Sequence, residues 1–136
     1  MIPLLDTHQH LVYRDIASYG WTKDIPPLAK DNFILEDYKN LTEGFGIDGT
    51  LFMETGVDNS DYKKEIKFVK SLANNTDNNL IGLISSIRPE TEEGFEEWLN
   101  ATIEMGVVGY RRILHVMPDE TSQNEIFRRN VRKIGD

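Results

Sequence analysis

The sequence Asp6-Thr7-His8-Gln9-His10 directly follows a short apolar run and is predicted to end a first, buried β-strand. Because alternate side chains of a strand point to the same face, we expect Asp6, His8 and His10 to share one face, opposite Thr7 and Gln9. Two neutral imidazoles two residues apart can hold one divalent cation, with zinc as the foremost candidate. Asp6 would then orient a ligand without binding the metal. The alternative is a polar strand end that binds no metal.

Composition limits the classes of protein and partner. The chain has 136 residues, of which 39% are apolar and 28% charged, so we expect one folded domain with a modest core. Its net charge of −8 disfavours nucleic acid and anionic membranes as partners, because both are bound through Lys and Arg clusters. The absence of cysteine excludes disulfides and thiolate metal sites. No signal peptide or membrane-length apolar run is recognisable, so we expect a cytoplasmic protein.

Beyond the first strand, apolar segments alternate with amphipathic ones. Strands are predicted over 49–53, 80–84 and 107–113, and helices over 36–44, 61–74, 91–106 and 122–135. Strands that alternate with helices at a spacing of about thirty residues are typical of β-α units. The predicted fold is therefore α/β, with a parallel sheet.

Local signals predict details of these elements. Leu41 and Ile103 are expected to face the core. Thr91 is expected to cap its helix, and the sequence Ser122–Glu125 matches a capping box for the last helix.

Residues 11–35 form a connection that is long for a strand-to-helix loop. Since it follows the first strand, it would lie over that strand's C-terminal end as a lid or pocket wall, and Trp21 is its candidate substrate contact. The alternative is a surface excursion in which Tyr19 and Trp21 serve as anchors.

Charged residues lie at the ends of other predicted strands. Glu54 could reach a metal or a substrate hydroxyl, or it is simply a solvated strand end. Arg111 and Arg112 are adjacent, so at most one is expected to face the pocket. We favour Arg111 as the catalytic and substrate-binding residue, because it alternates with Gly109 and would point inward if Tyr110 packs outward. A guanidinium there could grip a carboxylate or oxyanion. Arg112 would pair with helix carboxylates.

Two further residues are weaker candidates. His115 is expected to be a surface histidine, and Arg88 to belong to a helix-entry turn more readily than to a substrate site. All favoured positions lie at the C-terminal ends of strands, where parallel α/β folds place their ligand sites.

Three motifs resemble the amidohydrolase superfamily, specifically its sugar-lactonase branch, in which fuconolactonases and rhamnonolactonases are the nearest match. They are Asp6–His10, Gly46–Thr50 and Gly109–Arg112. Val12 departs from the pattern, since the family often has an aromatic residue there. The resemblance implies a TIM (β/α)8 barrel that opens a lactone, with the carbonyl polarised by a metal on His8 and His10, or by Arg111 and other donors. An activated water would then attack.

The chain is short for that fold, because such a barrel needs about 250 residues. We therefore expect residues 1–136 to be an N-terminal (β/α)4 portion, half of a barrel, completed by a C-terminal half or a second copy of the chain. The resemblance implies that the general-base aspartate and further histidines lie on later strands. The alternatives are a related decarboxylase or amide hydrolase, or an inactive truncated or assembly subunit.

Overall fold

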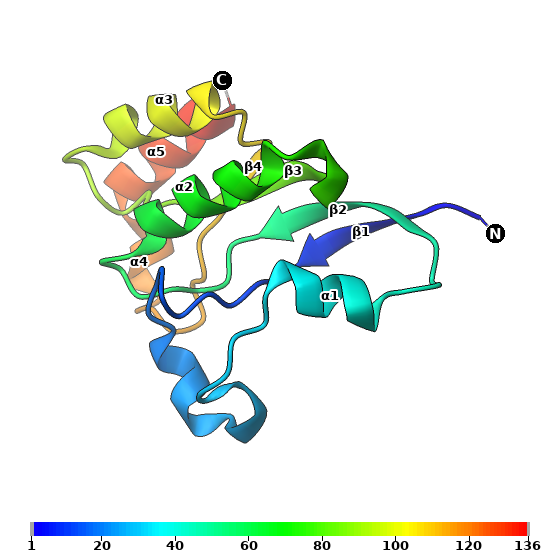
Figure 1. The fold of residues 1–136 in the computed structure, drawn as a ribbon. Coiled ribbons are helices and arrows are strands. Elements are labelled where there is room, and N and C mark those ends of the chain that lie inside the picture. The colour runs from blue at the N-terminus through cyan, green and yellow to red at the C-terminus, as the bar shows by residue number, and fades with distance from the viewer. Residues whose placement is uncertain (1, 136) are drawn as a thin grey trace.

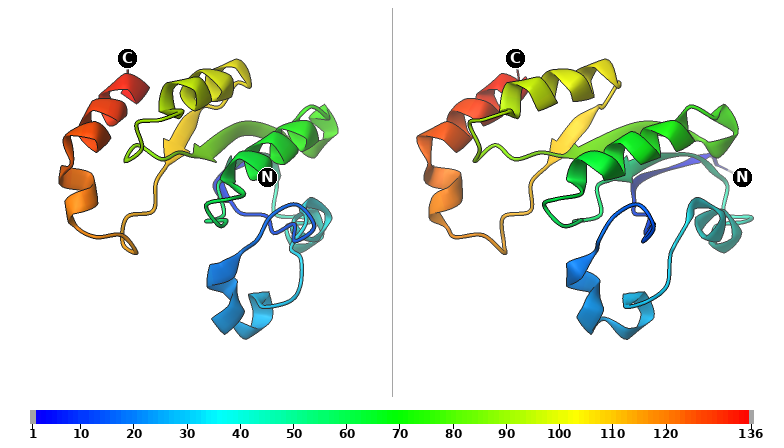
Figure 2. Two further views of the ribbon diagram at one scale, coloured as in Figure 1. Left: turned by 90° about the vertical axis from the view of Figure 1, so that its left-hand side faces the viewer. Right: turned by 60° about the vertical axis from the view of Figure 1, so that its left-hand side comes forward.

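A computed structural model describes residues 2–135, and its centre is one parallel sheet (Figure 1). Strands β1 (Leu4–Gln9), β2 (Ile47–Met53), β3 (Leu80–Ser86) and β4 (Gly109–Arg111) lie side by side in chain order. All three strand pairs are parallel. The sheet curls, as the turned views in Figure 2 show, and with its helices it forms half of a (β/α)8 barrel. The predicted fold class is confirmed.

Helices connect the strands. They are α1 (Leu35–Leu41), α2 (Tyr62–Ala73), α3 (Phe95–Glu104), α4 (Glu120–Gln123) and α5 (Glu125–Gly135), with 3-10 turns η1 (Gly20–Asp24), η2 (Pro26–Leu28) and η3 (Thr76–Asn78). Helices α2 and α3 lie side by side over one face of the sheet (Figure 2). No helix among residues 2–135 is long and apolar enough to span a membrane.

The main core lies between this helix layer and the sheet. Phe52 of β2 and Leu83 of β3 pair in register and are both buried. They belong to the same apolar cluster as Ile66 of α2 and Trp98 of α3. The apolar stripe of each helix therefore covers the strand side chains that point away from the curled interior.

Several predicted details are wrong. Leu41 and Ile103 are 68% and 58% exposed rather than inward. Thr91 does not cap α3, because its N–H donates to the Arg88 carbonyl in a turn and Gly94, at a φ of 71°, precedes the helix. The last helix is interrupted at Asn124, whose side chain accepts the N–H of Ile126 and replaces the predicted capping box.

Strand β1 is an edge strand and is not buried as predicted. Leu4 and Leu5 are about half exposed, at 51% and 50%. Within residues 2–135, β1 pairs only with β2, and β4 pairs only with β3. Both outer edges of the sheet are therefore unpaired in the described part of the chain.

The long connection 11–35 is ordered around a small core of its own. Val12 and Phe33 form an antiparallel bridge that closes the loop at its base. Val12, Ala17 and Tyr19 pack with Val57, which follows β2. The loop is thus held against the C-terminal end of the sheet.

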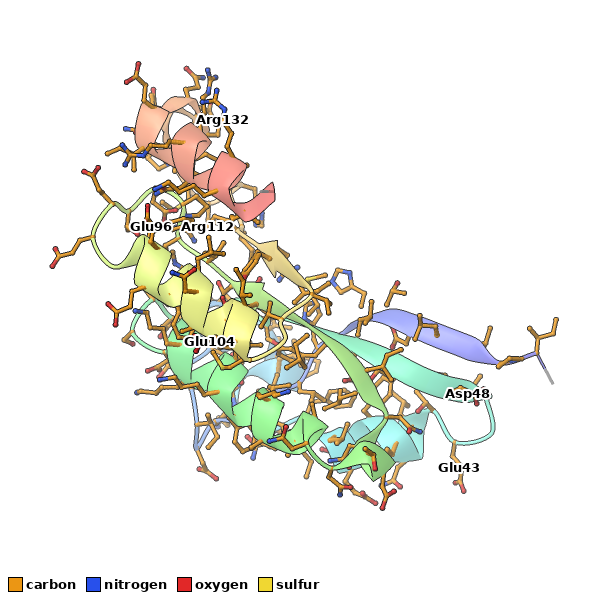
Figure 3. All side chains as sticks on the ribbon, turned by 90° about the horizontal axis from the view of Figure 1, so that it is seen from above. Glu43, Asp48, Glu96, Glu104, Arg112 and Arg132 are labelled. Carbon is orange, nitrogen blue, oxygen red and sulfur yellow. The ribbon has the colours of Figure 1, made fainter. Side chains whose placement is uncertain are left out.

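The two ends of the sheet carry different side chains, which Figure 3 makes visible from above. Glu43 and Asp48 lie at the end where β2 begins, and Arg112 lies at the opposite end. The histidines and arginines singled out from the sequence belong to this second, C-terminal end.

Candidate active site

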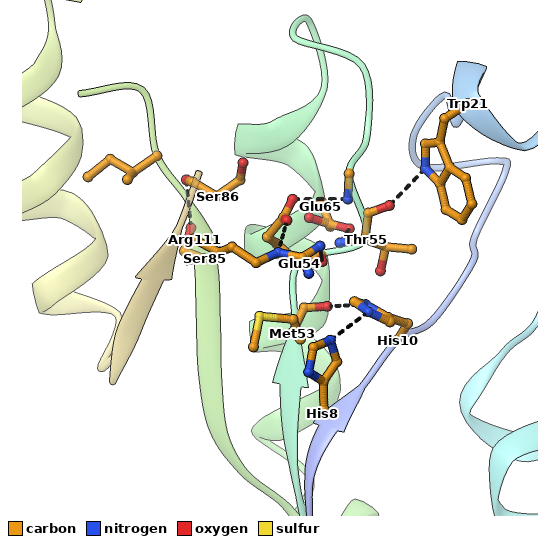
Figure 4. Close-up of polar contacts among 12 residues, drawn as sticks. His8, His10, Trp21, Met53, Glu54, Thr55, Glu65, Ser85, Ser86 and Arg111 are labelled. Carbon is orange, nitrogen blue, oxygen red and sulfur yellow. Dashed lines mark hydrogen bonds and ion pairs between the residues drawn. The ribbon is translucent and has the colours of Figure 1, made fainter. Parts of the chain in front are cut away.

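The two histidines of the first motif contact each other at the end of β1 (Figure 4). Their Nε2 atoms are 3.0 Å apart. His10 Nδ1 lies 2.9 Å from the Met53 carbonyl oxygen, to which it donates in the tautomer that leaves Nε2 unprotonated. A main-chain carbonyl that fixes one ring nitrogen is the usual support of a metal-binding histidine.

The histidine pair fits two positions of a metal site. Two nitrogen ligands at zinc bonding distance in a tetrahedral site are about 3.3 Å apart, close to the observed Nε2 separation. Burial is the largest influence on the pKa of His10 and lowers it, which favours the neutral ligand form. Among residues 2–135, no group of three or more acidic or histidine side chains is arranged to hold a metal ion. The described chain therefore offers two ligands, whereas a zinc site needs at least three from protein.

Asp6 supports this pair differently from the prediction. Its Oδ1 accepts the main-chain N–H of His8 at 2.9 Å, and its Oδ2 accepts the Tyr38 hydroxyl at 2.7 Å. The register explains the difference: Asp6 pairs with Thr50 and Gln9 with Phe52, so three steps on β1 match two on β2. This bulge breaks the expected alternation, and Asp6 positions His8 through the main chain rather than through its ring.

Glu54 and Arg111 form a salt bridge between the C-terminal ends of β2 and β4, the strands on either side of β3 (Figure 4). The Glu54 Oε1 accepts from Arg111 Nε, and the Glu54 carbonyl accepts from Nη2 at 2.8 Å. Glu54 Oε2 accepts the N–H of Gly56 at 2.9 Å, which the positive φ of that glycine allows. Glu54 is 2% exposed, and its carboxylate holds Arg111 at the wall of the site.

Arg111 itself retains free donors. Its side chain is 30% exposed, and Nη1 has no acceptor among the residues that the structure describes. A guanidinium fixed along one edge by a carboxylate presents its other edge in a defined direction. This edge is available for a substrate oxygen.

Glu65 is a buried carboxyl that the sequence reasoning did not single out. Its Oε1 accepts the N–H of Thr55 at 3.0 Å, and its Oε2 has no partner in the described chain. Burial is the main cause that raises the pKa of Glu65 to about 8, and the charge of Glu54 raises it further. The signal was present in the sequence, because Glu65 lies three residues after Tyr62 and four before Val69 on the apolar stripe of α2.

One open cavity of about 1120 Å³ brings the candidate residues together. It is lined by Asp6 and His8 of β1, by His10 directly after this strand, and from the other strand ends by Glu54 and Arg111. The structure thus places all these sequence candidates around one space at the C-terminal end of the sheet, as parallel α/β folds do with their ligand sites.

The loop 11–35 contributes to the wall of this cavity. Trp21, Leu28 and Phe33 line it. The Trp21 indole N–H donates to the Thr55 carbonyl at 2.9 Å, so the ring is anchored while remaining 47% exposed. Anchoring and cavity lining, which the sequence presented as alternatives, coexist at this residue.

Arg112 also lines the cavity, which corrects the expectation that only one of the adjacent arginines would. Strand β4 ends at Arg111, so strict alternation no longer applies at the next residue. Arg112 grips both oxygens of Glu90, at 2.5 and 3.2 Å, and Glu90 lies in the turn after β3 rather than in a helix. His115 is exposed and lines the same cavity. Arg88, which is buried, lines it as well.

A solved structure described as Amidohydrolase 2 from Bifidobacterium longum subsp. infantis has a similar fold. The superposition has a TM-score of 0.66 at 18% sequence identity and covers 97% of this chain and 47% of that chain. No protein-family model matches the sequence, and comparison with curated proteins gives no match. This chain therefore spans about half the length of that protein.

Proposed function

We propose that this chain carries part of the active site of an amidohydrolase-type hydrolase that opens a sugar lactone. The observation that supports it most is the cavity itself, where His8, His10 and the guanidinium held by Glu54 gather at one end of a half-barrel. The likeness to an amidohydrolase supports the barrel, and the motif resemblance supports the lactone.

Arg111 would act on the carbonyl group. Its free edge donates hydrogen bonds to the carbonyl oxygen, and its positive charge stabilises the oxyanion that forms when water attacks. Glu54 keeps the guanidinium in place before the substrate arrives, so little reorganisation is needed during the reaction. Trp21 forms an apolar wall for the sugar ring.

His8 and His10 would hold a divalent metal, zinc foremost, through their Nε2 atoms. When bound, such an ion supplies Lewis acidity and lowers the pKa of a bound water. Met53 and Asp6 keep the two rings in position for this role. The remaining ligands and the general-base aspartate are proposed to come from four further β-α units, either later in the same chain or from a partner.

The test is a hydrolysis assay on protein expressed from its complete coding sequence, with metal content measured in parallel. Substrates are the neutral fuconolactone and rhamnonolactone and the anionic glucarolactone, with a matched amide and a carboxylic acid to detect amide hydrolysis or decarboxylation. Arg111→Met is expected to lower kcat/KM for the lactone by about 100-fold to 1000-fold. Arg132→Met, on the exposed side of α5, is the control. Absence of lactone opening in metal-loaded protein, or an unchanged rate in Arg111→Met, would overturn the proposal.

A further inference from the structure

Arg88 is a buried cation in the wall of the same cavity. It follows the end of β3 and is 8% exposed. Its Nε donates to the Asn59 side chain at 2.9 Å, and its Nη1 donates to the Ser86 hydroxyl at 2.6 Å and to the Ile87 carbonyl at 3.1 Å. The guanidinium also lies over the Tyr62 ring, 4.4 Å from its centroid. All these partners are neutral.

The geometry leaves one nitrogen of Arg88 for a ligand. A guanidinium has five N–H groups, and the contacts above use three of them. The two N–H groups on Nη2 have no acceptor among residues 2–135. Nη2 is nevertheless not among the solvent-inaccessible side-chain atoms that lack a hydrogen-bond partner. Because Arg88 lines the cavity, we infer that Nη2 is reached from the cavity side.

One positive charge at this wall of the cavity has no salt-bridge partner among residues 2–135. Arg111 is paired with Glu54 and Arg112 with Glu90, whereas Arg88 has no carboxylate within salt-bridge distance in the described chain. Among the described residues, two of the three arginines are therefore paired with a carboxylate, and Arg88 is not. The acidic residues Asp6 and Asp58, which also line the cavity, form no salt bridge to any of the three.

An unpaired buried charge is costly unless a ligand supplies the opposite charge. Burial, followed by the charge of Arg112, lowers the pKa of Arg88, and the charges of Glu90 and Glu54 oppose this without forming a salt bridge to it. The neutral contacts orient the guanidinium without neutralising it. This arrangement is suited to a site whose counter-ion arrives with a ligand.

We propose that Arg88, with Arg112 beside it, binds an oxyanion group of the substrate, a carboxylate or a phosphate. The substrate would then be an anionic lactone, for example that of a sugar diacid or a phosphorylated sugar acid, rather than the lactone of a neutral sugar. This assignment deepens the proposed function, because the oxyanion would orient the lactone while its carbonyl lies at Arg111.

The test measures binding of stable anions by isothermal titration calorimetry, so that it needs no turnover. Probes are D-glucarate, inorganic phosphate and the uncharged D-glucitol, applied to the whole protein. We expect D-glucarate or phosphate to bind and D-glucitol not to bind. Arg88→Gln should raise the Kd of the binding anion by about tenfold to 100-fold, the loss of a charge-assisted hydrogen bond. Arg88→Lys should raise this Kd by a smaller factor.

Arg129→Gln is the matched control, because it removes the same charge from an exposed salt bridge with Glu92. Its Kd should stay within twofold of the unmodified protein. If Arg88→Gln does not fold, Arg88→Lys and Arg112→Gln decide the outcome. A raised Kd of the anion in these variants supports the proposal, and an unchanged Kd contradicts it. Equal binding of D-glucarate and D-glucitol, no anion binding, or anion binding that is indifferent to these substitutions overturns the proposal.

The two proposals fail separately. Anion binding that depends on Arg88 in a protein without lactonase activity keeps this site and refutes the lactone reaction. Hydrolysis of neutral and anionic lactones at equal kcat/KM keeps the reaction and refutes the anion site. Which of the two probes binds identifies the oxyanion as a carboxylate or a phosphate.

Discussion

At Glu54, a single carboxylate holds two parts of the site in place. It accepts from Arg111 with one oxygen and from the N–H of Gly56 with the other. Glu54→Gln replaces one accepting oxygen with an NH2 group, so one of the two donors meets another donor. We expect kcat/KM to fall at least tenfold through kcat, with KM little changed, and the free energy of unfolding to fall by about 1–3 kcal/mol. Steady-state kinetics and urea unfolding measure the two effects.

Glu97→Gln is the control for this change, since it makes the same substitution on the exposed side of α3. A purely structural role for Glu54 would lower stability and leave kcat of the folded fraction unchanged. That result would contradict the view that Glu54 positions the guanidinium for the reaction.

The buried carboxyl of Glu65 predicts a pH dependence of stability. Its folded pKa of about 8 lies above the usual 4.5. Between these values the folded protein keeps a proton that the unfolded chain has released, so stability falls as the pH rises from 4.5 to 8 and then levels off. Glu65→Gln should remove this slope and raise the free energy of unfolding at pH 8 by on the order of 3 kcal/mol. Urea unfolding at pH 5.5 and 8 tests it, and equal slopes in both proteins would refute it.

Single residues were predictable where a regular element carries them. The motif placed His8, His10 and Arg111 at strand ends, where the structure has them around one cavity. Alternation failed at Asp6, because the bulge depends on pairing with β2, and at Arg112, because β4 stops one residue earlier. Both failures have tertiary causes, since strand pairing depends on chain segments distant in sequence.

At the scale of elements, one buried polar residue ties α5 to the connection between β3 and α3. Asn130 is 2% exposed, and its Nδ2 donates to the carbonyls of Pro89 and Thr91 at 2.9 and 2.7 Å. Asn130→Ala leaves both carbonyls without this donor, and we expect the free energy of unfolding to fall by about 1–3 kcal/mol. Arg132→Ala, on the outer side of α5 in Figure 3, should change it by less than about 0.5 kcal/mol. Equal effects of the two substitutions in a thermal or urea melt would show that Asn130 does not anchor the helix.

Element positions followed from periodicity, and their ends did not. The prediction of 61–74 for helix α2 is close to the observed Tyr62–Ala73, because the apolar stripe and the polar flanks of this segment indicate the same bounds. Helix α3 begins at Phe95 instead of 91, since Gly94 adopts a left-handed conformation and Thr91 closes a turn. The break at Asn124 has a similar cause, a side-chain cap competing with a capping box. Such local hydrogen bonds are nearly equal in free energy, so sequence alone does not rank them.

For the whole molecule, strand and helix alternation was enough to predict the parallel α/β class, because each buried strand needs a helix cover. The curl of the sheet and the exposure of β1 depend on which strands pair with each other and which strand lies at the edge. The motif resemblance together with the chain length set the expectation of half a barrel, and the match to 47% of an amidohydrolase chain agrees with it.

The unpaired edges of β1 and β4 predict how residues 1–136 behave when expressed alone. A parallel sheet with two open edges and exposed Leu4 and Leu5 tends to pair with another chain. We expect dimers or larger species in size-exclusion chromatography with light scattering. Leu5→Lys places a charge on the edge strand and should shift the population toward monomer. Ile103→Lys, at a site of similar exposure on α3, should not. A stable monomer of the unmodified chain at tens of micromolar would show that these edges need no partner.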